Sequence, residues 1–325
     1  MTKLAVISEE TVRSIVTRQL AFESVQSAFE AVASNHAEVF DVVIGTGLNA
    51  GEAFAIKSGN DSDGRTVGFK CGTYWAGNNT AGLASHGSTI LLLDPDTGFP
   101  KVLVSASYLN GYRTAAANAV AVAHLARPDA TVLGVIGAGQ QAEQEIRALA
   151  EVRPLSRIKI STRSESRQRW IDNQLQDMDT NIQFTTAEDT VRGSDIVVTV
   201  TPSEAPLVRD EWVGEGTHIS AMGADDVGKF ELDTAIMKRA SLFADYPEQS
   251  IVIGEFQHAY SEGLINSADE ISALGSVTMG DSPGRSSDRD ITVFDSSGIA
   301  IQDLMVAQAV FVAASEMGQV QYVEF

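Results

Sequence analysis

The chain is poor in cysteine and in positive charge. It has 325 residues and one cysteine, Cys71, which excludes an internal disulfide and a cysteine-based metal site. Its 23 Lys and Arg residues are outnumbered by 43 Asp and Glu residues, so the formal net charge is −20. A surface this acidic repels nucleic acid and anionic membranes, and we expect neither as a partner.

Several motifs are also missing. The five histidines show no metal-ligand spacing, so no metal site is predicted. The absence of G-x-S-x-G and of a Walker loop removes the simplest hydrolase and kinase interpretations. No apolar run approaches the roughly 20 residues of a membrane span. The apolar stretch at the start is too short for a signal peptide, and Glu9 and Glu10 follow it, so we expect a cytoplasmic protein.

The most informative segment that is present is 131–142. An apolar, β-branched run leads into Gly137-Ala138-Gly139, and a helix-forming segment follows at once. Gly137 permits a tight turn, Gly139 lets the backbone approach a pyrophosphate, and Ala142 lets the helix pack closely on the strand. The G-x-G-x-x-A spacing in this context predicts a dinucleotide-binding turn. The alternative is an ordinary strand–helix turn in another α/β protein.

The pattern along the chain divides it in two. Residues 1–113 show one helical stretch, 8–34, and then runs of short strands, including a hairpin of 88–93 with 102–105. From 114 onward helices and strands alternate, which predicts a doubly wound parallel sheet. A long apolar helix at 299–317 is expected to return to the first part of the chain.

A few charged residues are candidates for chemistry. Lys70, at the end of a predicted strand, and Arg113, at the start of a predicted helix, can hold a substrate carboxylate; the alternative is a solvated or structural cation. Asp225 follows a predicted strand of the parallel sheet and is a candidate proton relay or, alternatively, a turn residue. Roughly 20 residues after the glycines, Arg163 favours NADPH, although its hydroxyl neighbours also suit NADH.

These pieces together resemble the ornithine cyclodeaminase/μ-crystallin family over essentially the whole chain. The resemblance rests on Lys70 and seven segments, in this order: Leu83–His86, Leu93–Gly98, Tyr112–Ala117, Gly137–Ala142, Gly223–Leu232, Pro283–Arg285 and Ile291–Gly298. Within the family, the iminosuccinate reductase and alanine dehydrogenase-like members look most similar. The resemblance implies an α/β fold: a Rossmann-type doubly wound sheet, 114–303, inserted into an α+β substrate and dimerisation domain, 1–113 plus 304–325, in a homodimer.

The resemblance also implies roles for individual residues. Lys70 and Arg113 would bind the substrate carboxylate, and Asp225, with Lys70, would be catalytic. His86, which follows Ser85 close to the expected substrate loop, is a candidate for lining the substrate pocket or for supporting it from behind. The implied contacts of the cofactor, NADH or NADPH, are Thr114, Gly137, Ala138, Gly139, Gln140, Gln141, Ala142, Arg163, Thr201 and Ser296.

One departure from the family bears on the substrate. Many members carry Arg where this chain has Phe40, and Met-Pro where it has Ile56-Lys57. The relocated cation, Lys57, suits a substrate with a second carboxylate. We therefore expect an imine reductase that forms an L-amino acid, with iminosuccinate to L-aspartate as the first choice. The alternatives are an alanine dehydrogenase, a cyclic ketimine reductase, an ornithine cyclodeaminase and, last, a non-catalytic NADPH-binding protein.

Overall fold

The chain folds into two compact units. The computed structural model describes residues 3–324. The first unit runs to Arg113 and resumes at Ile299, and the second is Thr114–Gly298. The sequence analysis assigned residues 299–303 to the dinucleotide-binding domain, whereas here they belong to the first unit. The reason is that α10 (Ala300–Glu316) is one continuous helix and packs on strands of the first unit.

The first unit is built on a mixed sheet. Within the described residues, eight strands form it in the order β18-β1-β7-β6-β5-β4-β2, with β3 paired to β4. Their bounds are β1 (Lys3–Ile7), β2 (Ala37–Val39), β3 (Val43–Thr46), β4 (Glu52–Asp61), β5 (Thr66–Trp75), β6 (His86–Leu93), β7 (Pro100–Ser105) and β18 (Gln321–Glu324). The predicted hairpin is confirmed as β6 and β7, which pair antiparallel.

Two helix predictions are corrected. The single helix expected over 8–34 is two, α1 (Glu9–Ile15) and α2 (Arg18–Ala33). The chain breaks between them because Thr17 is extended and its side chain accepts the first-turn N–H of Leu20. Helix α3 (Ser107–Leu125) begins seven residues before Thr114, where the sequence pattern predicts its start, so Arg113 lies inside it. A short 3-10 helix, η1 (Ala76–Ala81), follows β5.

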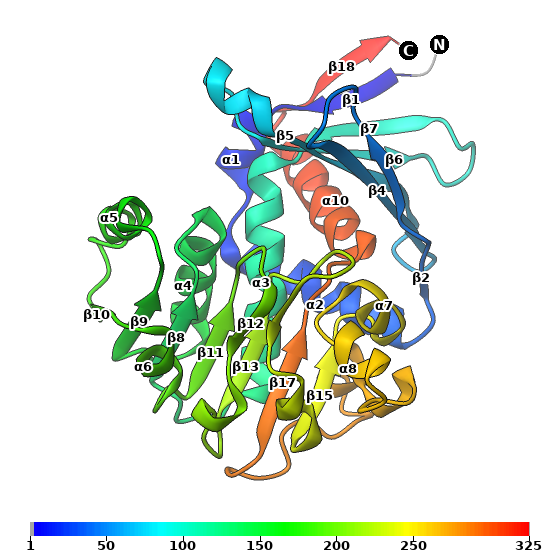
Figure 1. Cartoon of the computed structure of the whole chain (residues 1–325). Helices are drawn as coiled ribbons and strands as arrows, with labels where there is room; N and C mark the ends of the chain where they lie inside the picture. Colours follow the sequence, from blue (N-terminus) through cyan, green and yellow to red (C-terminus); the bar gives the residue numbers. More distant parts are fainter. Residues whose placement is uncertain (1–2, 325) are drawn as a thin grey trace. The chain divides into compact units, whose positions relative to one another are not determined.

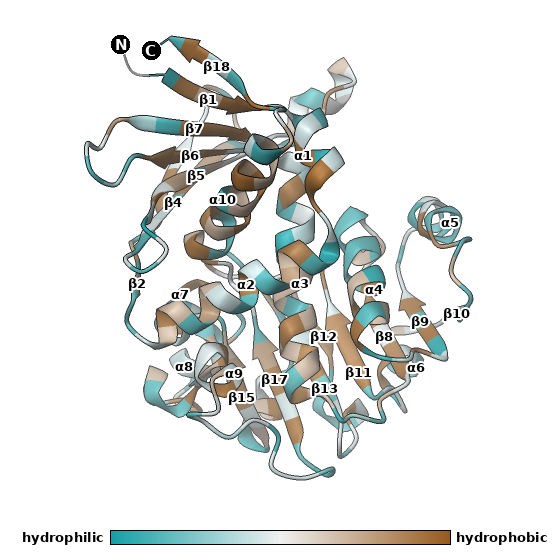
Figure 2. Ribbon diagram, turned by 180° about the vertical axis from the view of Figure 1, so that it is seen from behind, coloured by the Kyte–Doolittle hydropathy of each residue, from teal (hydrophilic) through white to brown (hydrophobic). Residues whose placement is uncertain are grey.

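The two faces of this sheet differ in burial. Side chains alternate along β5, β6 and β7, and one set, which includes Ile90, Leu92 and Val104, is fully buried. The alternate set, which includes Leu91 and Leu103, is only half-buried although it is equally apolar. Figure 2 colours hydrophobic residues brown, and much of β5 and β6 has this colour. The sheet therefore has an inner face that forms the core and an outer face that is apolar but incompletely covered.

The second unit is a doubly wound α/β structure, as predicted. Its eight strands, all parallel, run in the order β10-β9-β8-β11-β13-β17-β15-β16 among the described residues (Figure 1). Chain order reverses between β8 and β11, and ligands bind at such a switch point, outside the carboxyl ends of the strands. The strand bounds are β8 (Val132–Ile136), β9 (Arg157–Ser161), β10 (Asn181–Phe184), β11 (Ile196–Thr199), β13 (His218–Ala221), β15 (Ala240–Ala244), β16 (Ser272–Ala273) and β17 (Ile291–Asp295).

Helices and a small ribbon complete this unit. The α-helices that follow α3 are α4 (Gln140–Val152), α5 (Glu165–Gln174), α6 (Ala187–Val191), α7 (Pro247–Ile253), α8 (Gln257–Ser261) and α9 (Leu274–Thr278). Shorter 3-10 segments are η2 (Asp210–Trp212), η3 (Thr234–Lys238) and η4 (Ala268–Glu270). Strands β12 (Glu204–Val208) and β14 (Phe230–Leu232) pair in parallel beside the main sheet. The sequence analysis did not predict this ribbon, because both strands are short.

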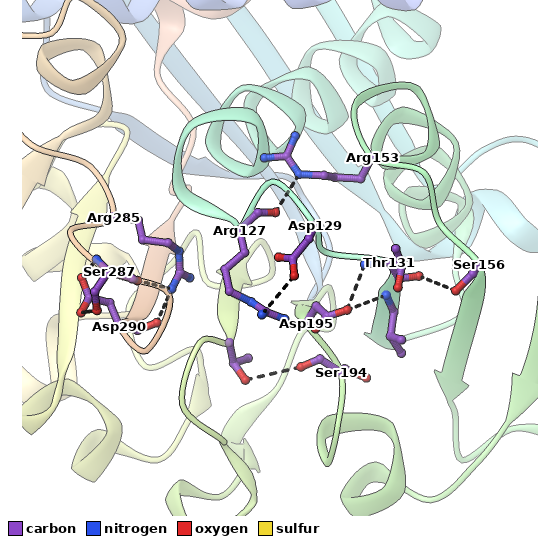
Figure 3. A network of polar contacts seen from close by, with 12 residues as sticks. Arg127, Asp129, Thr131, Arg153, Ser156, Ser194, Asp195, Arg285, Ser287 and Asp290 are labelled. Atoms are coloured by element: carbon purple, nitrogen blue, oxygen red, sulfur yellow. Dashed lines mark hydrogen bonds and ion pairs between the residues drawn. The ribbon is translucent and has the colours of Figure 1, made fainter.

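The amino-terminal edge of the parallel sheet is fixed by one carboxylate (Figure 3). Asp195 precedes β11, and its Oδ2 accepts the backbone N–H groups of Thr131 and Val132 at 2.9 Å each. Its Oδ1 lies 2.5 Å from Nη2 of Arg127. The side chain thus ties the start of β11 to the start of β8. This anchors β8 at the end opposite to its glycine-rich turn.

Candidate active site

A buried cluster of two cations and one carboxylate lies in the first unit. Lys70 Nζ is 2.7 Å from Asp303 Oδ2, and Arg113 Nε is 3.0 Å from Asp303 Oδ1. The three residues are only 7%, 8% and 0% exposed. The sequence analysis placed Lys70 at the end of a strand. In the structure Lys70 lies in the middle of β5, because this strand continues to Trp75. Both cations are therefore held by the interiors of regular elements.

Two amides complete the cluster. Asn110 Oδ1 accepts from Lys70 Nζ at 3.1 Å and from Arg113 Nη2 at 3.0 Å. Gln302 Oε1 accepts from Arg113 Nη1 at 3.2 Å. The Nε2 of Gln302 is buried and has no hydrogen-bond partner in the part of the chain that the structure describes. A buried donor of this kind is suited to an acceptor brought by a ligand.

The charges of the cluster do not balance. Burial lowers the pKa of Lys70 to about 7, helped by the charges of Arg113 and Lys57 and opposed by Asp303. Burial alone would raise the pKa of Asp303, but Arg113 and Lys70 outweigh it and lower that pKa. Two buried cations thus share one ionised carboxylate. A substrate carboxylate would supply the missing negative charge and favour the protonated form of Lys70.

Asp303 was not identified from the sequence. It lies 190 residues from Arg113, and no local motif connects the two. The available signal was its position inside an otherwise apolar helix, between Ile301 and Leu304. A carboxylate buried there requires a partner, but only the fold shows that the partners are Lys70 and Arg113.

The other two predicted substrate residues lie on the same face of the sheet. Lys57 on β4 is the direct cross-strand partner of Lys70 on β5, so both side chains project from the inner face. His86 pairs with Tyr74, and their ring centroids are 4.8 Å apart. Tyr74 is four residues beyond Lys70, which is about 13 Å along the strand. The structure thus brings Lys57 to the cation cluster and places His86 further along the same face.

The glycine-rich turn has the shape that a pyrophosphate requires. Gly137 has φ +127°, and a Cβ there would lie 2.8 Å from the carbonyl oxygen of Val200, so only glycine fits. A Cβ on Gly139 would meet no atom within 4 Å, which leaves the approach to the helix open. Gly139 is the N-cap of α4, no side chain caps this helix, and Ala142 is fully buried. These residues fit a dinucleotide bound at a helix N-terminus.

Other predicted cofactor residues follow strands of the same sheet. Arg163 comes after β9 and is exposed; the structure shows no ion pair for it within residues 3–324. Thr201 comes after β11, and Ser296 comes after β17, where its hydroxyl donates to Asp245 at 3.2 Å. The carboxyl ends of parallel strands share one edge, so these residues lie along the edge that carries the glycine turn. Thr114 is different, since it lies inside α3.

Asp225 lies in the loop after β13, on the same edge. Its side chain is 57% exposed, and its Oδ1 is 2.6 Å from Lys229 Nζ. The charge of Asp225 raises the pKa of Lys229 although burial opposes it. Gln257 holds the loop: its Oε1 accepts the N–H of Gly228 at 2.7 Å, and its Nε2 donates to two loop carbonyls, at 3.0 and 3.2 Å. Asp225 is therefore an anion on a braced loop.

The same edge contains buried carboxyls to which the sequence analysis gave no role. Glu231 Oε1 accepts the N–H and the hydroxyl of Thr201 at 2.8 and 2.7 Å, and its Oε2 accepts the N–H of Gly223 at 3.0 Å. Burial raises its pKa to about 7. Burial also raises the pKa of Glu255 and of Asp295 well above the ordinary range. Glu231 thus joins the loops that follow β11 and β13.

We expect Glu231 to make stability fall as the pH rises. Its folded-state pKa of about 7 exceeds its ordinary value, so its contribution is complete at acidic pH and is lost as the pH passes about 7. Between pH 5 and 8 the loss is on the order of 2 kcal/mol. Urea unfolding measured between pH 5 and 8 should show that Glu231→Gln loses less free energy of unfolding than the wild type does. The control Glu248→Gln, which changes an exposed residue, should lose as much as the wild type. Parallel curves for all three proteins would contradict the prediction.

The doubly wound sheet with its glycine turn fits the class of dinucleotide-dependent oxidoreductases, and the buried cations of the first unit are suited to a small acid. The profile of the ornithine cyclodeaminase/mu-crystallin family matches residues 6–318, and the chain belongs to this family.

The relatives include proteins with assigned activities. An iminosuccinate reductase of Paracoccus denitrificans is 39% identical over 324 residues, which cover 99% of this chain and all of the relative. Its crystal structure in complex with NAD+ covers 100% of both chains with a TM-score of 0.93. An alanine dehydrogenase of Archaeoglobus fulgidus is 35% identical over 94% of each chain. The Thermococcus litoralis Δ1-pyrroline-2-carboxylate reductase, bound to NADH and L-proline, is 27% identical over 98% of this chain and 100% of its own, with a TM-score of 0.91.

Two further findings concern metals and membranes. Among the described residues, no three or more His, Cys, Asp or Glu side chains are grouped so that they could hold a metal ion. None of the helices in residues 3–324 has both the length and the hydrophobicity needed to cross a membrane.

Proposed function

We propose that this protein reduces iminosuccinate to L-aspartate with a nicotinamide coenzyme. As a member of its family it is an NAD(P)-dependent oxidoreductase acting on C–N groups. The observation that carries the choice of substrate is an excess of positive charge at the inner face of the first unit's sheet. There Lys70 shares one carboxylate with Arg113 of α3, and Lys57 lies across from Lys70. A dicarboxylate supplies two negative charges to such a site. The relationship to an iminosuccinate reductase supports the same choice.

The reaction adds a hydride to the imine carbon and a proton to the imine nitrogen. The coenzyme, when bound, supplies the hydride and is itself oxidised. Lys70 and Arg113 hold the carboxylate next to the imine carbon, and Lys57 holds the distal carboxylate. Asp225, which is paired with Lys229, stabilises the protonated imine and relays its proton. Protonation matters because the positively charged carbon of an iminium accepts hydride far better than a neutral imine does.

A coenzyme-absorbance assay tests the proposal. Purified protein is mixed with NADH and ammonium, and oxaloacetate, pyruvate and a cyclic ketimine carboxylate are compared as substrates. Fast oxidation with oxaloacetate, and aspartate as the product, is the expected result. Lys57→Met should lower kcat/KM with oxaloacetate and ammonium about tenfold or more and leave pyruvate nearly unchanged, since only the dicarboxylate has a second charge to lose. Equal losses with both substrates would remove Lys57 from distal binding.

The second candidate is alanine formation from pyruvate and ammonia. It is favoured by the relationship to an alanine dehydrogenase, which is 35% identical. Preference for pyruvate in the same assay would establish it. No oxidation of coenzyme with any of the three substrates would contradict both reductase proposals and call for an ornithine deamination assay.

We propose NADH as the main coenzyme, since the relatives' structures contain NAD+ or NADH. Residues 161–164 at the end of β9 are Ser-Thr-Arg-Ser, without the carboxylate that would exclude a 2′-phosphate, so NADPH should also be used. Arg163→Ala is then expected to raise KM for NADPH about tenfold and to leave KM for NADH within twofold. The two KM values measured for wild type and variant check this, and an unchanged KM for NADPH would exclude Arg163 from the site.

We also propose that the chain forms a homodimer through the outer face of the first unit's sheet. Phe69, Leu91 and Leu103 form a cross-strand row on this face and are only half-buried. A solved alanine dehydrogenase relative, 33% identical, is described as a dimer. Leu91→Asp should weaken dimerisation about 30-fold, because it places a charge in an apolar contact. Sedimentation analysis should show monomer for this variant and dimer for Val252→Asp, which changes an exposed residue of α7.

A further inference from the structure

Three cross-strand rows follow one another on the inner face of the first unit's sheet. Because side chains alternate along a strand, the residues at every second position of β5 share this face. The rows are Lys57–Lys70–Ile90, then Ala55–Gly72–Ser88, then Ala53–Tyr74–His86. The middle row contains only small residues. It lies between the cations of the first row and the paired, mutually tilted rings of the third.

Gly72, in the middle row, is a glycine that the protein fold itself does not require. A Cβ built on it would meet no heavy atom within 4 Å, and its φ is not in the left-handed region. Gly68, on the same strand, is different, since a Cβ there would lie 2.2 Å from the carbonyl oxygen of Leu91. Packing therefore explains Gly68 but not Gly72. A glycine inside a strand that neither φ nor packing demands is typical of a place where a ligand or another backbone approaches closely.

The surroundings of this open space suit an anionic side chain. Lys70 and Lys57 lie in the adjacent row, about 7 Å along the strands, which is comparable with the span of a four-carbon dicarboxylate. The hydroxyl oxygen of Ser88 in the same row is buried and has no hydrogen-bond partner within the described residues. On the far side, the Tyr74–His86 ring pair limits how far a bound molecule could extend.

We infer that Gly72 is a specificity-determining residue, which leaves room for the methylene and distal carboxylate of the substrate. This inference rests on the proposed function. Lys57 would then bind the distal carboxylate from one side of that space, and Ser88 would donate an uncharged hydrogen bond to it. It also explains how one face could accept a dicarboxylate while limiting its length.

The test compares two substrates in Gly72→Ala. The new methyl group enters open space, so the variant should fold with an unchanged melting temperature. It should lower kcat/KM with oxaloacetate and ammonium about 20-fold and with pyruvate and ammonium less than threefold, because the pyruvate imine has no distal group. Ser88→Ala should reduce the dicarboxylate reaction about fivefold and spare pyruvate.

The matched control is Gly77→Ala. Gly77 lies in η1, and a Cβ there also meets no atom within 4 Å, so both reactions should keep their wild-type rates. A folded Gly72→Ala whose ratio of the two kcat/KM values equals that of the wild type would overturn the inference and leave the proposed function intact. A wild-type protein that does not reduce iminosuccinate would overturn both.

Discussion

Replacing Arg113 by methionine is expected to lower kcat/KM for the imino acid by about three orders of magnitude. The guanidinium is buried, and it shares Asp303 with Lys70. Without it the substrate carboxylate lacks one charge-assisted hydrogen bond at a buried site. A 1000-fold fall in kcat/KM corresponds to a loss of about 4 kcal/mol of transition-state stabilisation. Steady-state kinetics should place most of the loss in KM, since the bond to the carboxylate exists before the hydride moves.

The pH profile of this variant separates a binding role from a merely structural one. Lys70 must be protonated to bind a carboxylate, so wild-type kcat/KM should fall as the pH rises through about 7. The charge of Arg113 is one cause of that low pKa, and Arg113→Met should therefore move the fall to higher pH. The control is Arg65→Met, which removes an exposed ion pair with Asp96. It should change neither the value of kcat/KM nor the pH at which kcat/KM falls. A variant with near-normal KM would remove Arg113 from the substrate site.

The second large effect is expected for Asp225→Asn. The amide cannot take up a proton or stabilise a positive iminium, and kcat should fall about 100- to 1000-fold. KM for the coenzyme should stay within twofold, since the glycine turn after β8 is untouched. Lys229→Met should reduce kcat less, because it removes only the ion-pair partner of Asp225 and leaves the carboxylate in place.

The chain offers a matched control for this prediction. Asp226 is the adjacent exposed acid, and its carboxylate accepts only the N–H of Val227 in the described contacts, at 2.8 Å. Asp226→Asn should retain nearly full activity. If the two variants lose activity equally, the effect belongs to the loop as a whole, and the assignment of Asp225 as the proton relay is wrong.

The carboxyl-rich edge of the second unit shows why some groups escape sequence analysis. In a chain this acidic, nothing in the local sequence distinguishes three of its acids from exposed ones: Glu231, Glu255 and Asp295. They become unusual only through burial, which raises the pKa of each. Burial of a single polar residue depends on contacts from distant segments, and a local pattern does not contain them.

Local patterns were sufficient where a short segment determines its own conformation. The strand, the glycine turn and the helix of 131–150 were predictable because the apolar run, the glycines and the helix-forming segment follow one another directly in one βα unit. The β6–β7 hairpin was predictable for the same reason, since Asp94 and Gly98 close the turn between its strands. Alternation of strands and helices then predicted the parallel sheet.

Tertiary structure alone decided what the predicted residues contact. The sequence indicated Lys70 and Arg113 as cations for a carboxylate, yet it could not show that Asp303 lies between them or that Lys57 faces Lys70 across β4 and β5. It likewise could not distinguish Gly72, which faces open space, from Gly68, which is closely packed. The physical reason is common to all of these: strand register and helix packing bring together residues far apart in the chain, and charge, desolvation and free volume depend on those neighbours.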